Sequence, residues 1–123
     1  MQTSSIKKQT ALYVYDFVSV LIVPHLLRRF GWNCITAVYK DNFLEIAAAQ
    51  QPDIIILDQL SDSDLEFCRQ LKNDEKTKNI RLIVVTFGDE NISKAIKAGA
   101  DGHLNAPVSI LDFQNIIQPE SFS

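Results

Sequence analysis

Residues 52–58, which read Pro-Asp-Ile-Ile-Ile-Leu-Asp, restrict the fold of this 123-residue chain more than any other segment. Four apolar residues follow one another here without polar alternation. A strand with one solvent-exposed face alternates apolar and polar residues, whereas an unbroken apolar run is typical of a parallel strand covered by helices on both faces. Residues 82–85, Leu-Ile-Val-Val, repeat the pattern. The chain is therefore predicted to build a parallel sheet between two helical layers.

Three further strands and five helices are predicted around these two runs. The strands fall at 11–15, 34–38 and 102–104, and apolar residues at helical spacing indicate helices at 18–30, 43–51, 63–71, 89–98 and 109–117. Five successive strand–helix units predict a flavodoxin-like, doubly wound α/β fold with a five-stranded parallel sheet in the order 2-1-3-4-5. We expect a single domain over residues 1–123, with its core at about 8–118.

Helix starts are marked by residues that cap free backbone N–H groups. Asn42 and Ser63 each precede a glutamate by three residues, as in a capping box, and Asp89 and Ser109 are further predicted caps. Pro24 lies inside the first predicted helix, so it either kinks that helix or belongs to its first turn.

Composition and motifs exclude several classes of function. The net charge of −3 argues against a broad nucleic-acid footprint, and no apolar run reaches the roughly 20 residues of a membrane helix. Cys34 and Cys68 lie far apart, which favours free thiols over a zinc site. A glycine-rich phosphate loop, a nucleophile elbow and a catalytic triad are all missing, so we expect no enzyme activity.

Polar residues stand where the predicted strands end. Asp16, Asp58, Thr86 and Asn105 each follow an apolar strand segment. Because the carboxyl ends of parallel strands share one edge of the sheet, and ligand sites of doubly wound folds lie there, these residues predict the site.

Four segments resemble the receiver domain of bacterial two-component response regulators, over about residues 8–118. They are 11–16 (ALYVYD), 52–58 (PDIIILD), 83–86 (IVVT) and 98–107 (AGADGHLNAP). The resemblance implies a cytoplasmic module of phosphorelay signalling.

The resemblance also implies roles for individual residues. Asp58 matches the phosphoacceptor, Thr86 the residue that contacts the phosphoryl oxygens, and His103 the residue that reports the switch. Asp16, Asp58 and the backbone carbonyl of Leu60 match the ligands of Mg²⁺. Thr86 could instead satisfy backbone groups at a strand end, and His103 could be a half-buried packing residue.

Three departures from the family pattern predict an atypical receiver, a pseudo-receiver. Tyr15 replaces one acid of the metal-binding pair, Ala106 replaces a lysine, and Phe87 replaces a small residue that leaves room for the phosphate. Phosphoryl transfer depends on positioned cations that spread the developing charge, so these changes predict impaired or absent phosphorylation, with Mg²⁺ bound weakly or not at all.

The expected function is a protein–protein interaction with a histidine kinase or an output protein, and homodimerisation through residues 90–118 is a further expectation. Two alternatives stay open. One is a working response regulator that is phosphorylated on Asp58 with Mg²⁺. The other is a small-ligand pocket lined by Tyr15, Phe87 and Ala106.

Overall fold

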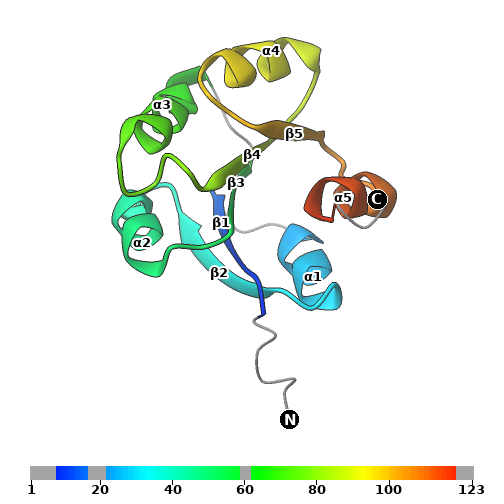
Figure 1. Ribbon diagram of the computed structural model, residues 1–123. Coiled ribbons are helices and arrows are strands. Elements are labelled where there is room, and N and C mark those ends of the chain that lie inside the picture. The colour runs from blue at the N-terminus through cyan, green and yellow to red at the C-terminus, as the bar shows by residue number, and fades with distance from the viewer. Residues whose placement is uncertain (1–7, 17–21, 59–61, 119–123) are drawn as a thin grey trace.

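A computed structural model describes residues 8–16, 22–58 and 62–118 (Figure 1). The five parallel strands pair in the order β2-β1-β3-β4-β5, which confirms the predicted topology. The strands are β1 (Thr10–Tyr15), β2 (Asn33–Val38), β3 (Ile54–Asp58), β4 (Arg81–Thr86) and β5 (Gly102–Asn105). The helices are α1 (Ile22–Arg29), α2 (Phe43–Gln50), α3 (Leu65–Asn73), α4 (Asp89–Lys97) and α5 (Ile110–Ile117), with a 3-10 turn η2 (Asp62–Asp64) before α3.

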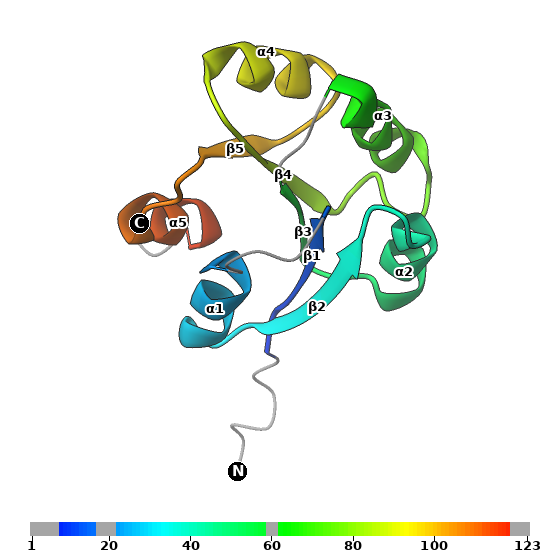
Figure 2. The same cartoon turned by 180° about the vertical axis from the view of Figure 1, so that it is seen from behind.

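Helices cover both faces of the sheet. Helices α1 and α5 lie on one face, and α2, α3 and α4 lie on the other (Figures 1 and 2). The side chains of β3 alternate between the two cores: Ile54 and Ile56 pack toward α1 and α5, while Ile55 and Leu57 pack toward the other layer. All four are almost fully buried, as the unbroken apolar run predicts.

In the described part of the chain, no helix is both long and apolar enough to span a bilayer.

Pro24 lies near the start of the described part of helix α1. That part spans Ile22–Arg29, so the buried proline is in its first turn. This position suits proline because the first turn of a helix has N–H groups without intrahelical partners. Of the predicted range 18–30, residues 18–21 lie outside the described residues, and the helix ends at Arg29.

The predicted caps are partly correct. Asn42 accepts a hydrogen bond from the Glu45 N–H at 3.4 Å and donates to its carboxylate, and Ser109 accepts from the Asp112 N–H at 3.1 Å. The N-cap of α3 lies one residue after the predicted Ser63 and the N-cap of α4 one residue before the predicted Asp89, so both of these predictions are wrong. Asp64 is the N-cap of α3 because η2 precedes that helix, and Gly88, with φ of +84°, is the N-cap of α4.

Asp101 fixes the turn between α4 and β5. Its carboxylate accepts the Leu82 N–H at 2.8 Å and the Lys72 ammonium at 2.9 Å. Lys72 also donates to the carbonyl of Ile80 at 3.1 Å. The preceding Gly99 has φ of +117°, and a Cβ there would lie 2.8 Å from the Lys72 side chain. The Ala-Gly-Ala-Asp segment is thus explained by backbone geometry and by these hydrogen bonds.

Candidate functional site

The predicted site residues end adjacent strands of the sheet. Asp58 is paired in register with Val85, and Thr86 with Asn105, so β3, β4 and β5 finish at one edge. Asp16 follows β1, the other neighbour of β3, and is exposed. Leu60, whose carbonyl is a predicted Mg²⁺ ligand, lies outside the described residues.

A buried tyrosine binds the carboxylate of Asp58. The hydroxyl of Tyr13, in the middle of β1, donates a hydrogen bond to Oδ2 of Asp58. Tyr13 is paired in register with Ile56, and both lie on the α1/α5 face of the sheet. Because side chains alternate along a strand, Asp58 lies on that same face, two residues or about 6.6 Å beyond Ile56. A tyrosine side chain spans this distance, so its ring fills the core while its hydroxyl reaches the site.

A second tyrosine binds the backbone of the same residue. The hydroxyl of Tyr39, just after β2, donates to the carbonyl oxygen of Asp58 at 2.8 Å. The Tyr39 ring stacks on Phe67 and meets Phe43 edge to face, both with centroids 5.8 Å away. This aromatic cluster joins the end of β2 to helices α2 and α3, and it orients the hydroxyl toward Asp58.

Sequence reasoning missed both tyrosines, although a signal was present. A buried tyrosine usually requires a partner for its hydroxyl, and Tyr13 stands in an otherwise apolar strand. Burial raises the pKa of the Tyr13 phenol well above its ordinary value, and the Asp58 carboxylate raises it further. Burial likewise raises the pKa of Tyr39. Both phenols therefore stay neutral at physiological pH and act as hydrogen-bond donors.

Thr86 carries a hydroxyl that is buried without a hydrogen-bond partner among the described residues. The residue is 1% exposed. Its carbonyl oxygen accepts the Ala106 N–H at 2.9 Å, just before the cis peptide bond between Ala106 and Pro107. A buried hydroxyl without a partner is uncommon, because the lost hydration is not replaced. Thr86 thus supplies a hydrogen-bonding group at the predicted phosphate position.

The three predicted departures have different surroundings. Tyr15 is half-buried and its ring stacks on Tyr13, with centroids 5.8 Å apart. Ala106 is half-buried against the α1/α5 core. Phe87 is 61% exposed, so its ring lies at the surface. The small-ligand pocket lined by these three side chains stays a prediction.

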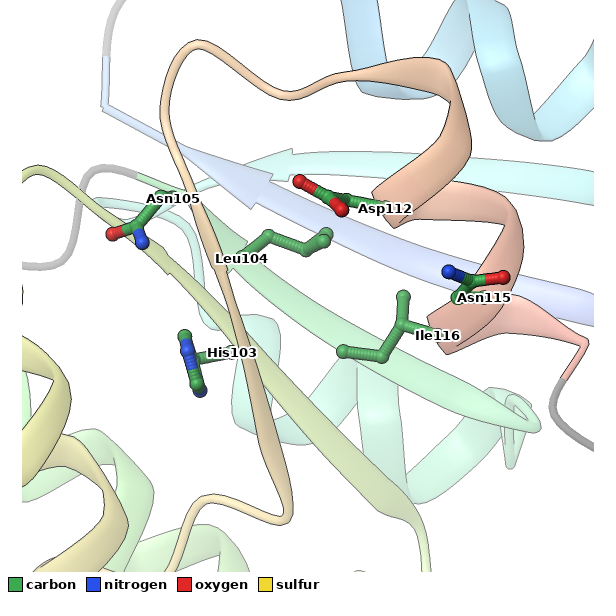
Figure 3. A pocket seen from close by; sticks show the side chains of 6 residues that line it. All are labelled: His103, Leu104, Asn105, Asp112, Asn115 and Ile116. Carbon is green, nitrogen blue, oxygen red and sulfur yellow. The ribbon is translucent and has the colours of Figure 1, made fainter.

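A pocket of about 390 Å³ lies elsewhere, between β5 and α5 (Figure 3). It is lined by His103, Leu104, Asn105, Asp112, Asn115 and Ile116. His103 is exposed, so its alternative interpretation as a half-buried packing residue is wrong. Its role as a switch stays a prediction.

The described residues around Asp58 offer few ligands for Mg²⁺. Mg²⁺ prefers six oxygens and is usually held by one or two carboxylates plus waters. Of the two predicted carboxylates, Asp58 accepts a hydrogen bond from Tyr13 on one oxygen, and Asp16 is exposed. Tyr15 has a phenol where the family pattern has an acid. Among residues 8–16, 22–58 and 62–118, no group of three or more histidine, cysteine or acidic side chains could hold a metal ion.

Comparison of the chain with known proteins finds relatives among signalling and regulatory proteins. No protein-family model matches the chain. The chain is 33% identical over 99 residues to the polar-differentiation response regulator DivK of Brucella ovis, covering 76% of this chain and 79% of DivK. It is 31% identical over 106 residues to the phosphate regulon transcriptional regulatory protein PhoB of Pseudomonas aeruginosa, covering 82% of this chain. The match spans 46% of the length of PhoB.

A solved structure has the same fold. The chemotaxis response regulator CheY4 of Vibrio cholerae superposes with a TM-score of 0.74 at 24% identity, covering 92% of this chain and 98% of CheY4. At this identity the superposition shows the shared fold alone.

Proposed function

Because this chain belongs to the receiver domains of two-component response regulators, we propose that it acts as a pseudo-receiver. It works by protein–protein interaction, through a surface held in one state, with phosphorylation of Asp58 impaired or absent. It has no enzyme activity of its own. The proposed setting is the cytoplasm, where two-component signalling takes place.

The observation that carries the proposal is the neutral chemistry around Asp58. The carboxylate accepts a hydrogen bond from a neutral phenol, Tyr13, and Tyr15 and Ala106 are uncharged at two positions where the family pattern has charges. Phosphoryl transfer relies on positioned cations to stabilise the charge that develops on the transferred group. Without those charges, Asp58 is a poor acceptor.

The proposed partners are a histidine kinase or an output protein, and a homodimer through residues 90–118 is part of the same proposal. Large apolar side chains are exposed along this region at Ile96, Ile110 and Leu111, which are 44%, 57% and 66% exposed. Phe113, in the same region, is fully buried in the α1/α5 core and does not contribute to such a surface.

One observation favours the second candidate, a working phosphoacceptor. The Thr86 hydroxyl is buried at the predicted phosphate position without a partner among the described residues, and a phosphoryl oxygen would provide one. In this case Asp58 would be modified with the help of a weakly held Mg²⁺.

Intact mass after treatment with a small phosphodonor and Mg²⁺ separates the two candidates. The pseudo-receiver proposal expects the untreated mass. A phosphoryl adduct that disappears in the variant Asp58→Asn would establish the working phosphoacceptor. The same variant controls for modification at other residues.

A further inference from the structure

We infer that the hydrogen bond from the Tyr13 hydroxyl to the Asp58 carboxylate weakens the binding of Mg²⁺ by that carboxylate. Tyr13 is thus a positioning residue, since it acts through Asp58. The inference deepens the proposed function and rests on it for the identity of Asp58 as the acceptor position.

The register between β1 and β3 brings the Tyr13 hydroxyl to the Asp58 carboxylate. Tyr13 and Ile56 are partners in register on the α1/α5 face, and Asp58 follows Ile56 on that face. From this level, the Tyr13 side chain runs along the strand direction and its hydroxyl meets the carboxylate. The ring is almost fully buried, with 2% exposure, so packing holds the hydroxyl at Asp58.

The backbone of Asp58 is held from the other side. The Tyr39 hydroxyl donates to its carbonyl oxygen at 2.8 Å, and the Tyr39 ring is fixed by its contacts with Phe43 and Phe67. The two phenols therefore bind one residue at two points, the carboxylate and the carbonyl. The bond from Tyr39 holds the backbone of Asp58 and makes no contact with its carboxylate.

The chemistry of the contact sets its consequence. A carboxylate that enters a Mg²⁺ site offers an oxygen lone pair to the ion, and the Tyr13 hydroxyl already uses Oδ2 as its acceptor. A hydrogen bond to a charged group is stronger than one between neutral groups. Mg²⁺ binding through Oδ2 must displace this bond, which leaves a buried phenol without its partner.

The test compares Mg²⁺ binding in two variants that each remove one hydroxyl and keep the ring. Tyr13→Phe removes the hydrogen bond to Oδ2 of Asp58, and calorimetric titration with Mg²⁺ alone should show affinity at least about tenfold higher. Tyr39→Phe is the matched control, because it removes the bond to the carbonyl oxygen and leaves the Tyr13 contact intact. We expect its Mg²⁺ affinity to stay within about twofold of the unsubstituted protein.

A second readout does not depend on the metal. The side-chain carboxyl ¹³C resonance of Asp58, assigned with Asp58→Asn, should shift in metal-free Tyr13→Phe and stay nearly unchanged in Tyr39→Phe. If Tyr13→Phe does not fold, Tyr13→Leu tests the same contact with an aliphatic residue of the kind that fills neighbouring strand positions. Unchanged Mg²⁺ affinity and an unchanged carboxyl resonance in the folded variant would overturn the inference.

Failure of this inference is distinguishable from failure of the proposed function. A phosphorylated unsubstituted protein with tighter Mg²⁺ binding in Tyr13→Phe contradicts the pseudo-receiver and supports the role of Tyr13. An unmodified protein whose Mg²⁺ affinity does not respond to Tyr13→Phe supports the pseudo-receiver and contradicts the role of Tyr13.

Discussion

At the scale of the residue, three neutral side chains of the described chain lie at or near Asp58. Tyr13 reaches the carboxylate from the core, Tyr39 reaches the carbonyl from an aromatic cluster, and Thr86 presents a hydroxyl that no described residue binds. The sequence predicts Asp58 and Thr86 as site residues because each ends an apolar strand. It does not reveal the Tyr13 contact, because that contact depends on the register between β1 and β3.

Two buried threonines of the described residues are expected to respond in opposite ways to replacement by valine. Thr86→Val removes a hydroxyl without a described partner, so we expect the free energy of unfolding to rise by about 1 kcal/mol. Thr77→Val is the control: the Thr77 hydroxyl donates to the carbonyl of Leu71 at 2.7 Å, and we expect a loss of about 1–2 kcal/mol. Urea unfolding measures both. A loss of stability in Thr86→Val would show that this hydroxyl has a partner in solution.

At the scale of the element, the order and type of strands and helices follow from patterning. The unbroken apolar runs place β3 and β4 in the sheet centre, and Asn42 and Ser109 cap α2 and α5 as their side-chain chemistry predicts. The errors occur where a local turn shifts the helix start, as η2 does before α3. Such a turn is decided by tertiary packing, which capping residues alone do not reveal.

Two substitutions at the turn before β5 test which interaction of Asp101 stabilises this turn. Asp101→Ala leaves the buried Leu82 N–H without its acceptor, so we expect it to cost about 1–3 kcal/mol in chemical unfolding. Lys72→Met keeps the side-chain stem and removes the charge. It should cost less than about 1 kcal/mol, because the ion pair with Asp101 is partly exposed. Equal losses in the two variants would mean that the ion pair, and not the backbone hydrogen bond, is the main contribution.

At the scale of the whole molecule, the buried ionisable groups are expected to make the protein less stable at alkaline pH. Burial raises the pKa of Cys68 to about 11 from 9.0, and it also raises the pKa values of Tyr13 and Tyr39. Above about pH 9 the unfolded chain releases protons that the native state keeps, so the unfolded state binds fewer protons and stability falls as pH rises. Below about pH 8 this contribution should be constant.

Thermal unfolding between about pH 7 and pH 11 measures this effect. The melting temperature should fall steadily above about pH 9, and Tyr39→Phe should show a shallower decline because one raised pKa is removed. A melting temperature that stays constant across this whole range in the unsubstituted protein would contradict the burial of these groups.

In the proposed pseudo-receiver, the receiver scaffold is kept while Asp58 no longer drives a switch. The most direct measurement is a ¹H–¹⁵N spectrum recorded while beryllofluoride, a phosphoryl mimic, and Mg²⁺ are added. We expect the amide resonances of Asp58, Thr86 and His103 to stay unshifted. Saturable shifts of these resonances that disappear in Asp58→Asn would contradict this claim and establish a working receiver.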